Sequence, residues 1–280
     1  MATDRTIAVF IGSIAIGLLI PLLVILSYVV WKGWRYLRPA FFTQDQALVG
    51  SSSPATVGGA KHAVIGTLEQ VALAMAISIP LGMATAVFMN EVGGRLVRPV
   101  RVVVDAMSGV PSIVAGLFIF AVWILGLHQS FSGIAAAFAM SILMLPTVTR
   151  TSVEVLRLVP DGLREASLAV GGTQWRTVWN VVLPTARSGL ITAVILGVAR
   201  VIGETALLIM TAFGASLVNY NPLHGPQQSL PLFVYQAYSI NTPSEVARAW
   251  TGALVLIAMV LFLFGAARLV GRARTGRVTR

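Results

Sequence analysis

The chain has 280 residues, of which 56% are hydrophobic and only 11% are charged. Soluble domains are about one quarter charged, so this composition excludes an ordinary soluble enzyme and favours an integral membrane protein. The net charge of +10 does not indicate a nucleic-acid-binding protein, because the Arg residues fall between apolar segments and form no basic patch with stacking aromatic residues. The absence of cysteine excludes disulfides and thiolate metal sites.

Six apolar segments run through the chain, and we read each as a transmembrane helix, which needs about 20 apolar residues. None alternates with a period of two, so helices are expected rather than the strands of a barrel. The predicted fold class is therefore all-α and polytopic. Residues 1–62 should form the first span and an extracytoplasmic loop, and residues 63–280 the main transmembrane domain. The expected spans are residues 7–30, 63–89, 110–127, 133–148, 190–212 and 250–270.

The distribution of Arg and Lys predicts the orientation of these spans. An even number of spans places both termini on one side of the membrane, and most basic residues then fall on that side. Cytoplasmic loops carry an excess of basic residues, so we expect both termini in the cytoplasm. The cluster of Lys32, Arg35 and Arg38 is a local exception, because it follows the first span on the outer side.

The arginine-bearing segment 153–187 lies between two spans and is too polar to enter the bilayer. Asp161 follows a proline and is expected to cap a short helix over residues 162–170. Gly171 and Gly172 should end this helix, because glycine readily adopts the left-handed conformation common after a helix C-terminus. The segment is therefore predicted to begin with a helix and a tight turn.

A second helix is expected after this turn, with Thr173 as its N-cap and Pro184 at its end. Four apolar residues recur at i, i+3, i+4 and i+7, which places them on one face; they are Trp175, Val178, Trp179 and Val182. The segment is thus predicted to be a cytoplasmic helix-turn-helix with a hydrophobic surface and cationic flanks. An amphipathic helix lying on the membrane surface is the alternative interpretation.

These patterns together resemble the type I permeases of ABC importers. The stretch Glu165-Ala-Ser-Leu-Ala-Val-Gly171, followed by Val181-Val-Leu183-Pro184, is similar in spacing to the cytoplasmic coupling loop of that family. Ser167 and Val181 are mild departures, since the family usually has Ala and Ile at these places. Within the family, the chain most resembles the PstA-type subunits of phosphate importers. The other segments that carry this resemblance are Gly66-Thr67, Pro80-Leu-Gly82, Ser108-Gly-Val-Pro-Ser-Ile-Val-Ala-Gly-Leu-Phe118, Ala199-Arg-Val-Ile-Gly-Glu-Thr-Ala206 and Ser229-Leu-Pro-Leu232.

The resemblance implies a permease subunit of an ATP-driven phosphate importer in the plasma membrane of a bacterium. It implies a second, PstC-type permease, two PstB-type ATP-binding subunits and an extracytoplasmic PstS-type phosphate-binding protein as partners, within membrane lipid and without nucleic acid. The chain would be no enzyme and bind no cofactor, because the partner ATPase would use ATP and Mg. The residues implied to form the ATPase-coupling contact are Glu165, Ala166, Ser167, Gly171, Val181, Leu183 and Pro184.

Within this implied contact, Glu165 would be a polar contact and Gly171 would form the tight turn. Glu165 has a second interpretation, since a carboxylate near the N-terminal end of a helix is favourable by itself.

Charged residues inside the expected spans are candidates for the transport pathway, because an isolated charge at the bilayer centre costs roughly 2.5 to 3.5 kcal/mol. Arg200 and Glu204 are four residues apart and should share a helix face. Arg200 could attract a phosphate oxyanion while Glu204 holds or gates it, or the two could form a purely structural ion pair. Glu69, near the outer end of the second span, is a weaker candidate that could simply reach water.

The stretch before the third span could add polar groups to the pathway. Gly109 and Pro111 are expected to break a helix there, which would expose backbone groups to a cavity. Ser108 and Ser112 could contribute hydroxyl groups, and helix N-termini can bind phosphate. A simple kink without any ligand contact is the alternative.

Other chemistries find no support in the sequence. There is no Gly-x4-Gly-Lys-Ser/Thr motif, no His-Glu-x-x-His pair and no Gly-x-Ser-x-Gly elbow, and the three His residues are isolated. Catalytic residues and metal ligands are therefore both predicted to be absent. A permease for sulfate or molybdate remains an alternative to phosphate. An ion-coupled secondary transporter is a further alternative, although no inverted repeat is visible.

Overall fold

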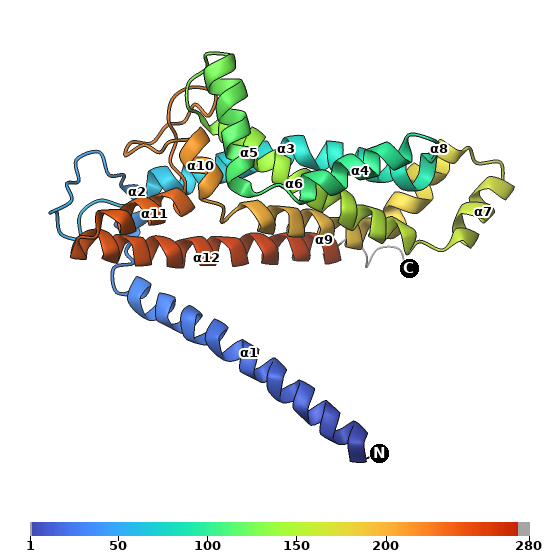
Figure 1. Cartoon of the computed structure of the whole chain (residues 1–280), viewed down its shortest axis with the longest axis horizontal. Coiled ribbons are helices and arrows are strands. Elements are labelled where there is room, and N and C mark those ends of the chain that lie inside the picture. The colour runs from blue at the N-terminus through green and yellow to red at the C-terminus, as the bar shows by residue number, and fades with distance from the viewer. Residues whose placement is uncertain (1, 274–280) are drawn as a thin grey trace.

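The computed structural model describes residues 2–273 (Figure 1). This part of the chain is built from helices and contains no strand. Three π-helical turns, η1 (Phe88–Val92), η2 (Phe120–Gly126) and η3 (Val178–Val182), continue neighbouring α-helices. The α-helices are α1 (Ala2–Trp34), α2 (Pro39–Thr43), α3 (Lys61–Val87), α4 (Val97–Ser108), α5 (Ser112–Ile119), α6 (Gly133–Arg157), α7 (Asp161–Ala169), α8 (Gln174–Thr177), α9 (Leu183–Val201), α10 (Ala206–Thr211), α11 (Leu230–Ile240) and α12 (Pro243–Ala273).

The centre of the bundle is α6, which packs against α3 and α9. Small side chains let helix backbones approach closely in a membrane, where packing drives helix association. The contacts of Val148 illustrate this: a Cβ added to Gly197 of α9 would lie 2.6 Å from Val148, and one added to Gly82 of α3 would lie 3.0 Å away. The fully buried alanines of α6 are Ala135, Ala136, Ala137 and Ala139.

The first helix, α1, stands away from the bundle along most of its length (Figure 1). It contacts α12 near its C-terminal end, where the ring of Tyr28 meets Trp250 edge-on at 5.1 Å and Gly33 approaches the Trp250 carbonyl. Most of its described apolar side chains are exposed. Only lipid or another protein can cover such a surface, because a helix that is apolar all round is buried or spans a membrane.

Five helices in the described residues are long and apolar enough to cross a membrane, and the number rises to six if one bent pair forms a single span. They are Gly12–Trp34, Lys61–Val92, Gly133–Arg157, Gln174–Val201 and Pro243–Leu269, and the bent pair is Val97–Ser108 with Ser112–Gly126. The predicted all-α polytopic fold of about six spans is therefore confirmed. The division at residue 62 stays a prediction.

One predicted break is confirmed and one predicted span is interrupted. Before the third span, α4 and the helix that begins at Ser112 meet at 103°, at the place where Gly109 and Pro111 were expected to break a helix. The fifth span was expected to reach residue 212, but α9 ends at Val201 and the short α10 begins only at Ala206. Hydropathy does not register this second break, because α10 is as apolar as the helix before it.

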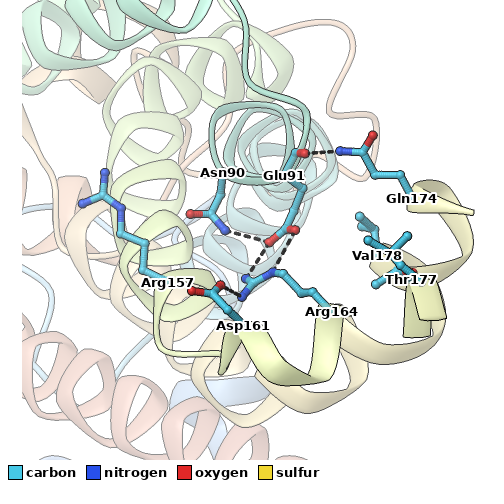
Figure 2. Close-up of a pocket in the computed structure, with 9 residues that line it drawn as sticks. Asn90, Glu91, Arg157, Asp161, Arg164, Gln174, Thr177 and Val178 are labelled. Carbon is cyan, nitrogen blue, oxygen red and sulfur yellow. Dashed lines mark hydrogen bonds and ion pairs between the residues drawn. The ribbon is translucent and has the colours of Figure 1, made fainter. Parts of the chain in front are cut away.

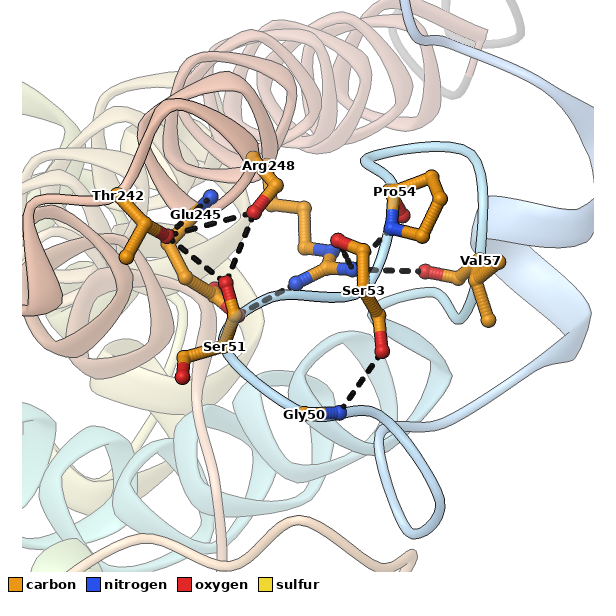
Figure 3. A network of polar contacts seen from close by, with 9 residues as sticks. Gly50, Ser51, Ser53, Pro54, Val57, Thr242, Glu245 and Arg248 are labelled. Atoms are coloured by element: carbon orange, nitrogen blue, oxygen red, sulfur yellow. Dashed lines mark hydrogen bonds and ion pairs between the residues drawn. The ribbon is translucent and has the colours of Figure 1, made fainter.

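At the end of the bundle where α12 begins, a buried ion pair fastens the loop that precedes α3 (Figure 3). Arg248 pairs with Glu245, and their side chains are only 2% and 5% exposed. The other side of the guanidinium donates hydrogen bonds to the carbonyls of Ser53, Pro54 and Val57 at 2.9 to 3.3 Å. The hydroxyl groups of Thr242 and Ser244 also donate to the Ser51 carbonyl, at 3.0 Å each, so the start of α12 holds this Ser-rich segment at several points.

We expect Arg248→Ala to destabilise the protein by about 3–5 kcal/mol, because it leaves a buried carboxylate and several carbonyls without partners. Thermal unfolding of the purified protein in detergent measures the effect. Arg35→Ala is the matched control, since Arg35 is exposed. The double change Glu245→Gln with Arg248→Met should recover part of the loss, and an unchanged melting temperature for Arg248→Ala would contradict the prediction.

Candidate functional site

The predicted coupling loop begins with the short helix α7, which ends in a tight turn. Gly171 adopts φ = +86° and donates its amide to the Leu168 carbonyl at 3.0 Å. Gly172 donates to the Ser167 carbonyl at 3.0 Å, and a Cβ at Gly172 would lie 2.6 Å from that oxygen. Both glycines therefore serve the turn, as predicted. Asp161 was expected as the N-cap, but Pro160 occupies that position and Asp161 is the first helical residue.

After the turn, the second helix starts where the sequence indicated but does not stop there. The side chain of Thr173 caps it by accepting the Arg176 amide at 3.4 Å. Pro184 was expected to end this helix, but α8, η3 and α9 form one helix over Gln174–Val201. A proline inside a membrane helix need not end it, and Pro80 and Pro146 likewise lie within α3 and α6. The coupling loop is thus continuous with a membrane span.

The four residues of the expected apolar face of the second helix are not all buried. Val178 and Val182 are buried, whereas Trp175 and Trp179 are 63% and 54% exposed. The two indole rings meet edge-on with centroids 5.6 Å apart. An exposed aromatic pair beside cationic residues is typical of a surface that a protein partner covers.

The structure places the remaining predicted coupling residues along this loop. Glu165 and Ala166 are exposed on α7, and the Ser167 hydroxyl lies 2.8 Å from that of Thr177 on α8. This hydrogen bond joins the two helices of the loop. Val181 and Leu183 are half-buried and Pro184 is exposed.

An ion pair that the sequence analysis missed fastens the loop to the membrane domain (Figure 2). Arg164 of α7 donates to both carboxylate oxygens of Glu91 in η1, at 2.9 and 3.2 Å. It also donates to the carbonyls of Leu156 and Val159 at 3.0 and 2.6 Å, and to Asp161 at 3.0 Å. Arg164 thereby joins α7 to the ends of two spans, η1 after α3 and the end of α6.

The Glu91 end of this contact is itself held by two amide side chains. Asn90 donates to the Glu91 carboxylate at 2.7 Å, and Gln174 of α8 donates to the Glu91 carbonyl at 2.5 Å. The side chains of Glu91 and Arg164 are only 7% and 18% exposed. The hydrogen bonds to Glu91 raise the pKa of Arg164 above its ordinary value, so the guanidinium remains charged. Together with Arg157 and others, these residues line a cleft of about 620 Å³.

One signal in the sequence could have found this contact. Asn90 and Glu91 are polar residues at the end of a long apolar run, and Arg164 is one of the four Arg residues of the polar segment 153–187. The pairing itself joins residues 73 positions apart, and no local pattern reports such a distance.

The charged pathway candidates Arg200 and Glu204 form an ion pair across the end of α9. We expected both residues to lie on one continuous helix, but α9 ends at Val201, between them. Arg200 is 47% exposed and Glu204 18%. The guanidinium is therefore accessible, while the carboxylate that holds it is largely buried.

The weaker candidates lie at two other places. Glu69 is half-buried in α3 and accepts a hydrogen bond from the Gln227 amide, which belongs to the segment before α11. Ser108 is the last residue of α4 and donates to the Val104 carbonyl at 2.9 Å, while Ser112 opens α5. Ser108 and Ser112 therefore flank the 103° bend. No group of three or more potential metal ligands occurs among residues 2–273.

Comparison with known proteins places this arrangement in a family. The family described as "Binding-protein-dependent transport system inner membrane component" matches residues 78–276. The "Phosphate transport system permease protein PstA 1" of Mycobacterium tuberculosis (strain CDC 1551 / Oshkosh) is 40% identical over 261 residues, which are 92% of this chain and 85% of that protein. The PstA protein of Mycobacterium leprae (strain TN) is 42% identical over 253 residues, 89% of this chain and 83% of its own length.

A solved structure supports the fold independently. The inward-facing MetNI methionine ABC transporter (CY5 native crystal form) aligns with a TM-score of 0.60, at 24% sequence identity, over 79% of this chain and 95% of that chain. The chain thus shares its helical architecture with a permease of an ABC importer. Together with the match over residues 78–276, this shows that the chain belongs to the family of binding-protein-dependent transport system inner membrane components, the permeases of ABC importers.

Proposed function

We propose that the chain is the transmembrane permease subunit of an ATP-driven phosphate importer. The observation that carries the proposal is the 40% identity, over 92% of this chain, to a relative named as a phosphate transport system permease. The intact coupling loop supports it, because a permease without an ATPase partner would need no such loop. The importer would lie in a bacterial plasma membrane with both termini of this chain in the cytoplasm.

The partners follow from the same proposal. A second, PstC-type permease would complete the translocation pathway, two PstB-type subunits would hydrolyse ATP with Mg, and a PstS-type protein would deliver phosphate from outside. This chain would carry out no catalysis and hold no cofactor. The exposed Trp175 and Trp179 pair, on the same loop as the exposed Glu165, would supply a surface for one ATPase subunit.

The contacts of the coupling loop suggest how ATPase motion would reach the spans. A push on α7 would pass through Arg164 to Glu91 at the end of α3. A push on α8 would pass directly into α9, because the two are parts of one helix. Two spans would thus move together when the ATPase dimer closes, and Arg200 at the far end of α9 would move with them.

Uptake of labelled phosphate tests the proposal. Cells that lack this chain should recover uptake when the wild-type chain is restored, and excess sulfate or molybdate should not compete. Inhibition by sulfate or molybdate would assign the importer to that other oxyanion. Uptake that persists without the partner ATPase would instead indicate a secondary transporter.

Glu165→Arg tests the ATPase contact in the same assay. We expect reduced uptake in cells that still place the chain in the membrane, because a reversed charge on the exposed face of α7 opposes docking. Arg95→Ala, at an exposed position outside the loop, controls for a general change of surface charge. Full uptake with Glu165→Arg would show that Glu165 is not part of the contact.

A further inference from the structure

A groove on the membrane domain, distinct from the coupling cleft and the pathway candidates, is almost entirely apolar. It lies along α9, with Met83 of α3 on one side and Ala267 of α12 on the other. A single charged residue, Arg187, lines it. Its other lining residues, all on α9, are Leu183, Leu190, Ile191, Val194 and Ile195.

Arg187 lacks the partners that a guanidinium in such surroundings requires. Its Nη2 atom is buried and has no hydrogen-bond partner in the described part of the chain. None of the ion pairs among residues 2–273 includes it. Arg187 as a whole is half-buried, so this part of its guanidinium has lost water without gaining a hydrogen-bond partner in return. A group from outside this chain that accepts hydrogen bonds, such as an anion, would compensate the loss.

The order of residues along α9 indicates the shape of that partner. Arg187 lies just beyond Pro184, where the polar coupling loop passes into the apolar helix. The apolar groove residues then continue from Leu190 to Ile195, away from the loop. On α12, the exposed Arg268 directly follows Ala267. An anionic group at one end and a hydrocarbon chain along the rest would complement this pattern.

We infer that the groove binds an anionic phospholipid of the surrounding membrane, with its phosphate on Arg187 and an acyl chain along α9. Basic pockets between transmembrane helices near the cytoplasmic side bind such headgroups. The negative headgroup supplies the charge that Arg187 lacks, and the acyl chain covers the apolar lining. A second permease subunit could cover the same groove if it offered a carboxylate or backbone carbonyls to Arg187.

Native mass spectrometry of the whole importer, purified in mild detergent, tests this inference. The wild-type complex should retain phosphatidylglycerol or cardiolipin after a wash, and added inorganic phosphate should not displace it. Arg187→Ala should remove most of this lipid, and Arg187→Lys should retain more of it. Ile191→Trp, which fills the groove but keeps the cation, should also remove it. Arg98→Ala is the matched control, because Arg98 is exposed on α4 outside the groove.

Size-exclusion chromatography of each variant shows whether the complex is intact, and so separates loss of lipid from loss of a subunit. Equal lipid retention by wild type and Arg187→Ala in intact complexes would overturn the inference. Loss of the second permease from Arg187→Ala, with lipid unchanged on the chain that remains, would assign the groove to that subunit instead. Displacement of the bound anion by inorganic phosphate alone would show that the site holds the free ion and not a lipid.

Discussion

Replacing Arg164 with alanine is expected to lower phosphate uptake about tenfold or more, while the chain still reaches the membrane. Removing one partner of a buried ion pair costs about 3–5 kcal/mol, and each 1.4 kcal/mol is a factor of ten. The change leaves the Glu91 carboxylate and the carbonyls of Leu156 and Val159 without their donor. We expect α7 to lose its fixed position against α3, so that ATPase closure no longer moves that span.

Two further variants make this prediction specific. Arg164→Lys should retain only part of the uptake, because one ammonium group cannot reproduce the forked contacts of a guanidinium. Arg95→Ala, at an exposed position outside the coupling loop, should behave as wild type. ATP hydrolysis by the reconstituted complex gives the second readout: we expect Arg164→Ala to hydrolyse ATP without importing phosphate. Wild-type uptake by Arg164→Ala would rule out this contact as a coupling element.

The second large effect is expected at Arg200. Arg200→Ala should lower uptake about tenfold or more in a complex that assembles normally, because removing a charge-assisted contact with a passing oxyanion costs roughly 1.5–3 kcal/mol. The exposure supports this expectation: the Arg200 side chain is nearly half exposed while its partner Glu204 is largely buried. A purely structural ion pair would not need to leave its cation accessible.

Uptake and assembly must be measured together for Arg200. Arg200→Lys retains the charge and should keep part of the uptake, and Thr192→Ala, at an exposed position on α9, is the matched control. Co-purification of the second permease reports assembly. If Arg200→Ala fails to assemble, the pair with Glu204 is structural and the proposed contact with phosphate is wrong.

The sequence predicted those features of the fold that depend on local composition. The long apolar runs predicted the spans, because a membrane-spanning helix requires only about 20 consecutive apolar residues. The Gly171 turn and the Thr173 cap were predictable because they depend on residues close together in the chain. Pro184 misled the prediction, because a membrane helix tolerates an internal proline, as Pro80 in α3 and Pro146 in α6 also show.

The features that the sequence did not reveal depend on contacts between distant segments. Glu91 and Arg164 lie 73 residues apart, and their pairing exists only because α7 folds back against the end of α3. Arg248 lies just before the expected span 250–270 and is part of no motif, yet its side chain is 2% exposed and holds residues 53–57. Burial of a charged residue depends on the whole fold, so it cannot be predicted from composition and residue spacing.

The uninterrupted helix Gln174–Val201 has a mechanical consequence. Its 28 residues make a rod of about 40 Å at 1.5 Å per residue, with the proposed ATPase contact near one end and Arg200 at the other. If such a rod tilts by about 5° about its loop end, the far end is displaced by about 3.5 Å. That displacement is comparable to the length of a hydrogen bond. A small rotation on the cytoplasmic side is thus geometrically sufficient to separate a guanidinium from an anion that it holds.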